Sequence, residues 1–199
     1  MIGTGGVGKT MITTQFVRNE FSEHYDPTIE EFYQKQVEVD KRAAVLEITD
    51  TAGNDQFRMM REMYLGNSDA YVVVYSVVSK SSFLELPGML DDIQHLKPDR
   101  AAAPVIVVGN KCDLPAAERE VTTDEGKDLA QRYNCMFTEA SARLNQGITE
   151  LFMDVTKNLV LKRGLATDDD KRKRKRKDKD DGKDGGKDGG KRKHRCIIM

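Results

Sequence analysis

The sequence predicts an α/β fold in which helices flank a mostly parallel sheet. Between residues 3 and 163, short apolar runs alternate with amphipathic stretches, which is the rhythm of βαβ units. Residues 71–78 and 105–108 are apolar on both alternating faces, as strands covered by helices on either side are. These two runs are therefore expected to be central strands.

The first strands of the chain are expected to form a hairpin at the sheet edge. Residues 31–50 contain two strand candidates joined at residues 40–42, and Gln36, Glu38 and Asp40 alternate with apolar residues. An edge strand has unpaired backbone groups, so this edge would be available to partners.

Two local signals mark the later helices. Pro87 and Gly88 interrupt what would otherwise be a helix over residues 81–97, which predicts a kink or a late start. Thr122 followed by Glu125 predicts a capping box that opens another helix.

The chain divides into one domain, residues 1–164, and a tail, residues 165–199. The tail is rich in Lys, Asp and Gly and is expected to be disordered. Residues 171–199 hold 14 Lys and Arg against 5 Asp, so a basic tail follows an acidic domain. Apolar residues at helical spacing predict that the domain closes with a helix; they are Ile148, Leu151, Phe152, Val155 and Leu159.

The composition argues against several classes of protein. Cys112, Cys135 and Cys196 are far apart, which suits a reducing compartment better than a disulfide framework and gives no zinc-type spacing. The sequence has no apolar stretch of membrane-span length and no signal-peptide pattern. Membrane contact is therefore expected to need an anchor.

A phosphate-binding loop is the first chemical motif. Residues 3–10 read GTGGVGKT and fit the pattern G-x-x-x-x-G-K-[ST]. Glycines let backbone N–H groups turn toward phosphates, and the lysine supplies a positive charge. A helix beginning near Lys9 adds the positive end of its dipole.

Three further motifs point to a guanine nucleotide. Asp50 follows the apolar run 45–48, so its carboxylate is at a strand end and can hold a Mg²⁺-bound water. Residues 110–113, NKCD, contain an aspartate that can accept from guanine N1–H and the exocyclic amine, a donor pair that adenine lacks. Residues 139–143, EASAR, can present a backbone N–H to the guanine carbonyl oxygen.

The order of these motifs resembles the Ras/Rap branch of the Ras superfamily of small GTPases. The matching segments are GTGGVGKT, YDPTIEEFY, DTAGNDQF, NKCD, EASAR and CIIM. The resemblance covers about residues 2–163 and the last four residues. It implies a P-loop NTPase fold with a six-stranded-type sheet, and a switch that binds GDP or GTP with Mg²⁺, hydrolyses GTP to GDP and phosphate, and acts in membrane-associated signal transduction.

The resemblance also implies roles for single residues. Lys9 neutralises the β- and γ-phosphates, and Gly53 senses the γ-phosphate through its backbone N–H. The metal is held by the Thr10 and Thr28 hydroxyls and, through water, by Asp50. Phe21 packs edge-on against the guanine and Lys111 covers a base face. Asn110 and Ser141 hold the Asp113 loop, and Asp113 and Ala142 select guanine.

The catalytic residues implied are Lys9, Thr28, Gly53 and Asn54. The nucleotide-binding residues implied are Gly3, Gly5, Gly6, Val7, Gly8, Lys9, Thr10, Met11, Phe21, Tyr25, Pro27, Thr28, Gly53, Asn110, Lys111, Asp113, Ser141, Ala142 and Arg143.

The sequence departs from this family at three places. Asn54 stands where Ras has the glutamine that orients the attacking water, and its side chain is one methylene shorter, so intrinsic hydrolysis is expected to be slow. Only Met1 and Ile2 precede the phosphate loop, where the family has a full apolar strand in the middle of the sheet; the first strand is therefore expected to be truncated. Glu31 and Phe32 stand where Ras and Rap have aspartate and serine.

Partners are implied at two segments. Residues 23–32 and 53–65 would order around GTP and relax after hydrolysis. A guanine-nucleotide exchange factor, a GTPase-activating protein and effectors with Ras-binding-type domains are expected, the effectors adding a strand beside Glu30 and Glu31 at this first switch segment.

The tail carries a lipidation motif. Residues 196–199 fit C-a-a-X, which predicts farnesylation of Cys196 and removal of the last three residues. The basic runs 171–177 and 191–195 supply a second signal for an anionic membrane, on the cytoplasmic face of the plasma membrane or an endomembrane. A nuclear address stays an alternative, and nucleic-acid binding is not expected because aspartates are interspersed and aromatics are absent.

Two other functions remain open at this stage. A P-loop ATPase or kinase would use the same phosphate loop, although Asp113 in its NKxD setting argues against it. The second alternative is an adaptor that is tethered to the membrane and impaired in nucleotide binding, and a truncated first strand favours it.

Overall fold

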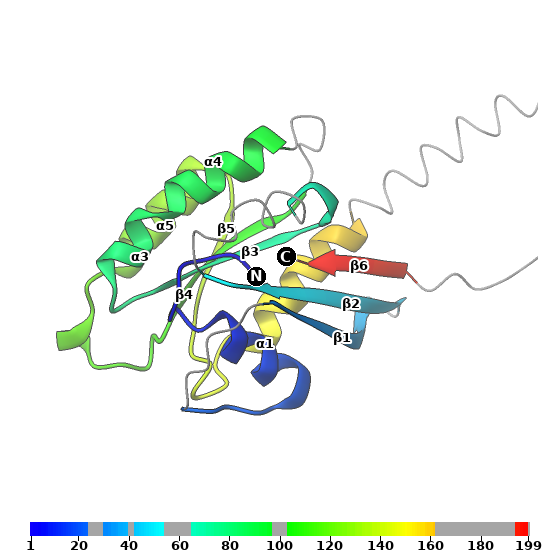
Figure 1. The fold of residues 1–199 in the computed structure, drawn as a ribbon, viewed down its shortest axis with the longest axis horizontal. Helices are drawn as coiled ribbons and strands as arrows, with labels where there is room; N and C mark the ends of the chain where they lie inside the picture. The colour runs from blue at the N-terminus through cyan, green and yellow to red at the C-terminus, as the bar shows by residue number, and fades with distance from the viewer. Residues whose placement is uncertain (24–29, 40–41, 54–64, 97–102, 162–193, 199) are drawn as a thin grey trace, which may run out of the picture.

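The computed structural model describes residues 1–23, 30–39, 42–53, 65–96, 103–161 and 194–198. Figure 1 shows strands between helices, with both chain ends near the middle of the molecule. The described elements are α1 (Lys9–Arg18), β1 (Glu30–Val39), β2 (Arg42–Thr51), β3 (Tyr71–Ser76), α3 (Lys80–Leu84), α4 (Leu86–Leu96), β4 (Val105–Asn110), η2 (Ala116–Glu118), α5 (Thr123–Arg132), β5 (Met136–Ala140) and β6 (His194–Ile198). A last helix is described over residues 148–161.

The strands form two three-stranded sheets, in the orders β1-β2-β6 and β3-β4-β5. Ile198 of β6 forms an isolated parallel bridge with Ala70, the residue before β3, and Ile2 forms another with Val73 of β3. Among the named strands, pairing is parallel except between β1 and β2, whose register runs from Glu30 opposite Thr51 to Val39 opposite Arg42. The predicted α/β class and the edge hairpin are therefore confirmed, while the turn residues 40–41 lie outside the described residues.

Strand β3 shows why both faces of the sheet are covered. Val72 and Val74 belong to a core cluster with α1 and the last helix. Tyr71, Val73 and Tyr75 belong to a second cluster with α3, α4 and α5 on the other face. Successive side chains of a strand point to opposite faces, so a run that is apolar throughout needs two layers of helices.

The two helix signals are confirmed. The helix expected over residues 81–97 is divided at Glu85 into α3 and α4, and Pro87 lies in the first turn of α4, where a missing N–H costs no helical hydrogen bond. Thr122 and Glu125 form the predicted capping box at the start of α5.

Strand β6 differs from the prediction. Residues 194–198 belong to the tail that the sequence predicted to be disordered, yet they pair in parallel with β2 and lie between β2 and β3. Residues from the far end of the chain therefore lie beside β2 in this sheet. Residues 162–193 lie outside the described residues. In the described part of the chain, no helix is both long and apolar enough to cross a membrane.

Candidate functional site

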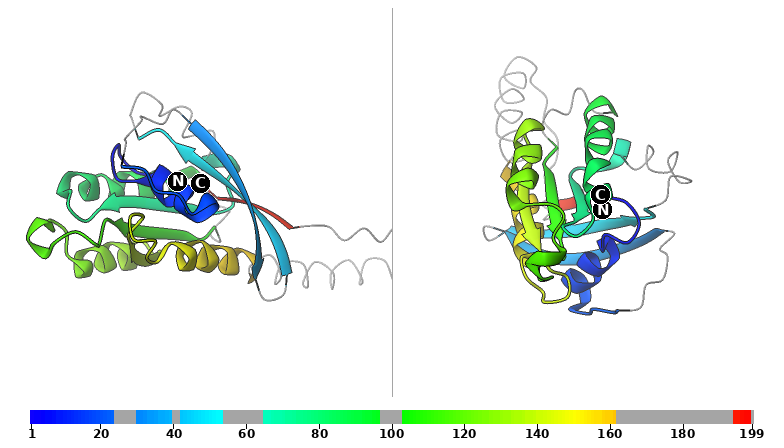
Figure 2. Two further views of the ribbon diagram at one scale, coloured as in Figure 1. Left: turned by 90° about the horizontal axis from the view of Figure 1, so that it is seen from below. Right: turned by 90° about the vertical axis from the view of Figure 1, so that its left-hand side faces the viewer.

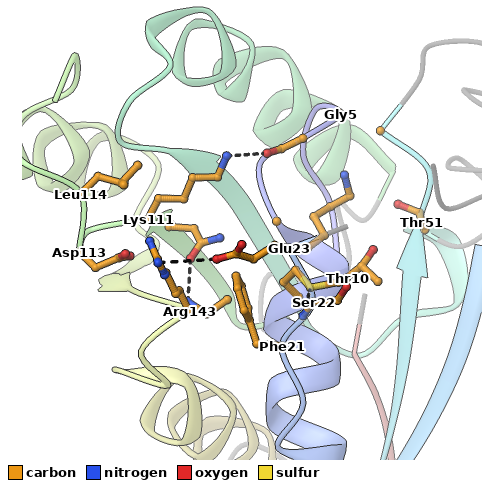
Figure 3. Close-up of a pocket in the computed structure, with 17 residues that line it drawn as sticks. Gly5, Thr10, Phe21, Ser22, Glu23, Thr51, Lys111, Asp113, Leu114 and Arg143 are labelled. Atoms are coloured by element: carbon orange, nitrogen blue, oxygen red, sulfur yellow. Dashed lines mark hydrogen bonds and ion pairs between the residues drawn. The ribbon is translucent and has the colours of Figure 1, made fainter. Parts of the chain in front are cut away.

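The site is a cavity of about 410 Å³ at the edge of the sheet where the strands end (Figure 3). Its walls come from the loop before α1, the end of β2, the segment after β4 and the loop after β5. Parallel strands bring their carboxyl ends to one edge of a sheet, which is where α/β proteins bind ligands.

Gly8 joins the phosphate loop to α1. Its φ of 96° is in the left-handed region, and a Cβ placed on it would lie 2.3 Å from Asn110 Nδ2. Only glycine fits this junction. No side chain caps the first turn of α1, so its backbone N–H groups remain directed toward the cavity end of the helix.

Lys9 lines the cavity from the first turn of α1. Its Nζ donates to the carbonyl oxygens of Gly3 at 2.8 Å and Thr4 at 2.9 Å, and the residue is buried. The loop carbonyls therefore hold an ammonium group inside the ring of backbone that the loop forms. This is a concentrated positive charge beside a helix N-terminus, an arrangement suited to phosphate.

Asp50 and Thr10 bring oxygen ligands together below the phosphate loop. The Thr10 hydroxyl donates to Asp50 Oδ2, while Asp50 Oδ1 is buried and has no hydrogen-bond partner among the described residues. Burial raises the pKa of the Asp50 carboxyl, and the Thr10 hydrogen bond opposes this shift. An unsatisfied buried carboxylate oxygen beside a hydroxyl fits a hard cation such as Mg²⁺.

A metal site made of protein carboxylates alone is not present in the described residues. They contain no group of three or more His, Cys, Asp or Glu that could hold a metal ion. A cation held by Thr10 and Asp50 would therefore take other ligands from water, from a bound phosphate or from residues outside this set.

Asn110 connects the phosphate loop to the loop after β5. Its Nδ2 donates to Val7 O at 2.8 Å, and its Oδ1 accepts from Ala142 N at 3.3 Å. Lys111 follows in the left-handed region, with φ of 66°, and its Nζ donates to Gly6 O at 2.9 Å. Two adjacent residues at the end of β4 thus fix the phosphate loop from across the cavity (Figure 3).

The end of the cavity away from the phosphate loop is formed by Phe21, Asp113, Leu114 and Arg143. Phe21 is partly exposed, and Arg143 forms an exposed ion pair with Glu23 at 3.6 Å. The ring of Phe21 and the aliphatic stem of Lys111 provide two apolar surfaces, and the Asp113 carboxylate provides a hydrogen-bond acceptor. A planar ring with N–H donors matches this combination.

Most residues named from the sequence line this one cavity. They are Gly5, Gly6, Gly8, Lys9, Thr10, Met11, Phe21, Gly53, Asn110, Lys111, Asp113, Ala142 and Arg143. Gly3, Val7, Asp50 and Ser141 are not among its lining residues. Gly3 and Val7 offer the carbonyls described above, and Ser141 Oγ accepts from Leu144 N at 3.0 Å. Tyr25, Pro27, Thr28 and Asn54 lie outside the described residues, as does most of both predicted switch segments.

Three lining residues had no sequence prediction: Ser22, Thr51 and Leu114. Each is next to, or one residue beyond, a predicted residue, so adjacency along the chain was the available signal. Glu23 was predicted only as the first residue of the switch segment 23–32. Ser22 and Glu23 reach the cavity because the chain after α1 passes over it.

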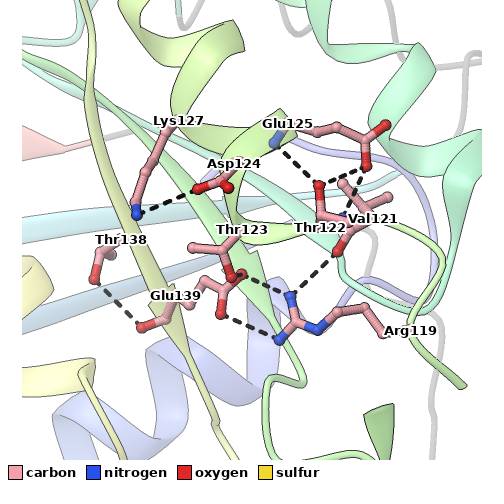
Figure 4. A network of polar contacts seen from close by, with 9 residues as sticks. All are labelled: Arg119, Val121, Thr122, Thr123, Asp124, Glu125, Lys127, Thr138 and Glu139. Atoms are coloured by element: carbon pink, nitrogen blue, oxygen red, sulfur yellow. Dashed lines mark hydrogen bonds and ion pairs between the residues drawn. The ribbon is translucent and has the colours of Figure 1, made fainter. Parts of the chain in front are cut away.

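A polar network joins Arg119, the start of α5 and β5 (Figure 4). Arg119 donates to both carboxylate oxygens of Glu139, at 2.8 Å and 3.2 Å, and Thr123 Oγ1 donates to the same carboxylate at 3.0 Å. The Glu139 side chain raises the pKa of Arg119, chiefly through these hydrogen bonds. One residue along, Ala140 O accepts from Cys112 N at 3.2 Å. The segment that contains Asp113 is therefore tied to the strand that leads into Ala142.

Comparison with known protein families gives one match that covers the site. The Ras family model matches residues 1–161, which include every residue that lines the cavity. The match and the geometry agree on the same loops, and together they show that the chain belongs to the Ras family of small GTPases, enzymes of the P-loop NTPase fold that hydrolyse GTP.

Proposed function

We propose that this chain is a GDP/GTP switch whose domain, residues 1–164, binds guanine nucleotide with Mg²⁺ in the cavity described above. The observation that carries the proposal is that Lys9, Thr10 and Asp113 line a single cavity, with Asp50 bonded to Thr10. A phosphate-binding charge, a cation site and a base-selecting carboxylate are thereby within reach of one ligand.

In this proposal the phosphates lie on the loop of residues 3–8. Lys9 gives up its carbonyl partners in part and neutralises the β- and γ-phosphates, and the first N–H groups of α1 donate to them. Thr10, Thr28 and Asp50 would hold Mg²⁺, which when bound neutralises charge on the phosphates during transfer. At the other end, Asp113 accepts from the guanine N1–H and amine, Phe21 and Lys111 cover the ring, and Ala142 N donates to its carbonyl oxygen.

For hydrolysis, Gly53 is proposed to contact the γ-phosphate through its backbone N–H. Support comes from its close approach to the phosphate loop, because a Cβ on Gly53 would lie 2.3 Å from Gly5 N. Asn54 would orient the attacking water with a shorter side chain than glutamine, so the intrinsic rate is expected to be slow and to depend on a GTPase-activating protein.

Strand β1 is the proposed effector edge. It lies at the end of its sheet, with Phe32 66% exposed, and such an edge can accept a strand from a Ras-binding-type domain. Tyr33 donates to Glu31, so one of the two acidic residues expected to meet effectors is already engaged within the strand.

Membrane attachment is proposed through farnesylation of Cys196, with the basic tail as the second signal. One prenyl chain binds a membrane only marginally, so the lysines and arginines of residues 171–195 would supply attraction to anionic lipids. The proposed location is the cytoplasmic face of the plasma membrane or an endomembrane.

The experiment that tests the switch is binding of fluorescent GDP and GTP to the purified 1–199 chain, in Mg²⁺, with unlabelled GTP or ATP as competitor. Binding that GTP displaces and ATP does not would support the proposal. Displacement by ATP would favour a P-loop ATPase, and absence of binding by a folded chain would favour the membrane-tethered adaptor.

A further inference from the structure

Two segments from distant parts of the sequence face each other at the end of the cavity away from the phosphate loop, which we call the base end. The chain after α1, residues 19–23, forms the α1 wall, and the loop after β5, residues 141–146, forms the β5 wall. Figures 1 and 2 show the α1 wall passing beside the β5 wall. Phe21 and Glu23 line the cavity from the first wall, and Arg143 lines it from the second. A ligand at the base end would therefore contact both walls.

One contact between the walls joins two asparagines. Asn145 Nδ2 donates to Asn19 Oδ1 at 2.9 Å. Their φ angles of 53° and 58° are in the left-handed region, which asparagine tolerates better than most residues with a Cβ. Asn19 is the C-cap of α1, where its backbone N–H donates to Gln15 O. Asn145 lies in a turn closed by backbone hydrogen bonds between Ser141 and Gln146 at 3.0 Å. The backbone fixes both partners, so this contact is a fixed point between the walls.

The second contact between the walls is an ion pair at the far end of the α1 wall. Arg143 Nη2 lies 3.6 Å from Glu23 Oε1 (Figure 3). The two side chains are largely exposed, at 59% and 76%. Such a pair is weak and is screened by salt, so it can break and re-form readily.

Phe21 lies along the chain between these two contacts, and its ring is 39% exposed. The next residue is attached to α1 by a weak hydrogen bond, since Ser22 N donates to the sulfur of Met11 at 3.4 Å. The α1 wall is thus fixed at its start and held only by weak contacts toward its end. Opening of the ion pair would let this wall move away from the β5 wall and carry Phe21 with it.

We propose that the Glu23–Arg143 pair is a latch that controls passage of the nucleotide base into and out of the cavity, with the Asn19–Asn145 contact as its hinge. The inference rests on the proposed guanine-nucleotide site and adds the control of its opening. Glu23 and Asn145 are then positioning residues, because they act through the two walls and not on the reacting phosphates.

A latch and a direct contact with the nucleotide predict different kinetics. A latch that opens equally before and after the nucleotide enters limits association and release alike. Weakening it raises both rate constants by the same factor and leaves Kd unchanged. Loss of a direct contact acts mainly on the release rate, and Kd changes with it. The two roles are therefore separable by measurement.

Association and release of fluorescent GDP, measured on the 1–199 chain in Mg²⁺, test the latch. Glu23→Gln should raise both rate constants about threefold, the size expected for an exposed ion pair, with Kd within ~2-fold of the wild type. Glu20→Gln, which removes the charge of an exposed carboxyl in the same wall but outside the cavity lining, should change neither rate. An increase in NaCl from ~0.05 M to ~0.5 M should accelerate release from the wild type more than from Glu23→Gln.

Asn145→Asp tests the hinge without altering a residue that lines the cavity. It places an acceptor opposite Asn19 Oδ1 and keeps a residue type that tolerates the left-handed region. Association and release should both rise by at least ~3-fold, because the hydrogen bond between the walls is lost. Asn134→Asp is the matched control, since Asn134 is also exposed, also has φ of 53° and does not line the cavity. It should change neither rate.

Three results would overturn the inference. Unchanged rate constants in both Glu23→Gln and Asn145→Asp would show that the walls do not limit passage of the base. A change in release and Kd with association unaltered would show that these side chains contact the nucleotide directly. A folded wild-type chain that binds no GDP would refute the proposed function and the inference with it, whereas GDP binding with unaltered rates in the variants would refute the inference alone.

Discussion

Asp113 lines the base end of the cavity beside Leu114 and Arg143. Replacing it with asparagine keeps the size of the side chain and turns one acceptor into a donor. Asp113→Asn should therefore weaken GDP and GTP binding by about 1.5–3 kcal/mol, roughly 10- to 100-fold, since hydrogen bonds to a charged group are lost. Binding of xanthine nucleotides, which carry a carbonyl in place of the guanine amine, should improve.

The measurement is competition against fluorescent GDP, with Asp124→Asn as the matched control. Asp124 is an exposed carboxylate on α5 and is not among the residues that line the cavity, so its replacement should leave both nucleotides unaffected. An unchanged preference in Asp113→Asn would exclude Asp113 as the base-selecting residue.

Asn54 supports a second prediction at this scale. In the same backbone geometry, a glutamine side chain reaches one methylene further toward the attacking water. A small displacement of the amide group from this water lowers the rate of hydrolysis by a large factor. Asn54→Gln should accelerate single-turnover GTP hydrolysis by roughly tenfold or more. Rapid quench of preloaded GTP measures this rate, and a variant no faster than the wild type would mean that Asn54 does not limit hydrolysis.

Residues of the site were predictable where a contiguous motif names them. The residues from Gly5 to Thr10 surround the phosphates as one loop, so a single motif predicted all of them. The ion pair of Glu23 with Arg143 was not predictable, because it depends on the path of the chain after α1. No local pattern encodes that contact.

At the scale of elements, the start of α5 gives a prediction on pH. Glu125 accepts from Lys80 Nζ, the Thr122 N–H and the Thr122 hydroxyl, and these contacts, Lys80 first, lower the pKa of Glu125 to about 2. A carboxyl whose pKa is lowered on folding stabilises the fold above its unfolded value of 4.5, and this stabilisation is lost as pH falls toward 2.

Urea unfolding between pH 6 and about pH 3 checks this. The wild type should be more stable than Glu125→Gln at pH 6, and the difference should shrink as the pH decreases. Glu150→Gln, an exposed carboxyl on the last helix, is the control. A difference that does not change with pH would show that the charge of Glu125 is not the cause.

The link between the segment after β4 and β5 gives the other element-scale prediction. Glu139 and Arg119 are largely buried, with side-chain exposures of 19% and 22%, and breaking their paired hydrogen bonds should cost about 1–3 kcal/mol. Glu139→Gln should accelerate GDP release several-fold because the segment that runs from Asp113 to Arg119 loses its side-chain contact with β5, the strand that leads into Ala142. The double variant Arg119→Gln/Glu139→Gln should add little, and additive effects in fluorescent GDP release would argue against a shared role.

Elements that depend on local chemistry were predictable, and the one that depends on distant pairing was not. Pro87 and the Thr122 capping box act within one helical turn, so spacing alone located them. Strand β6 has only five residues after a long polar stretch, and its partner strand is β2, far away in sequence. No periodicity in such a segment could have identified its neighbour.

For the whole molecule, stability should depend on nucleotide. A ligand that binds only the folded state stabilises it, by about 2.7 kcal/mol at a hundredfold excess over Kd. Excess GDP with Mg²⁺ should therefore raise the melting temperature of the chain, EDTA should reverse part of the gain, and ATP should have no effect. Differential scanning fluorimetry measures this, and an equal shift with ATP would contradict guanine selection.

The layered architecture could be predicted because residues 71–78 and 105–108 are apolar on both faces. A strand of that kind is stable only between two layers, and α1 with the last helix forms one, while α3, α4 and α5 form the other. Composition could not predict that β6 is the strand beside β2, since several apolar runs would satisfy the same backbone groups equally well.

The pairing of β2 with β6 also sets an order of events during protein synthesis. Residue 44 leaves the ribosome long before residue 194, so the pairing of Ala44 with His194 can form only when translation of the chain is nearly complete. Until then β2 and the residue before β3 lack the partner that β6 provides. The pairing of β2 with β6 thus has a high contact order, and its formation is the stage of folding at which we expect chaperones to matter most.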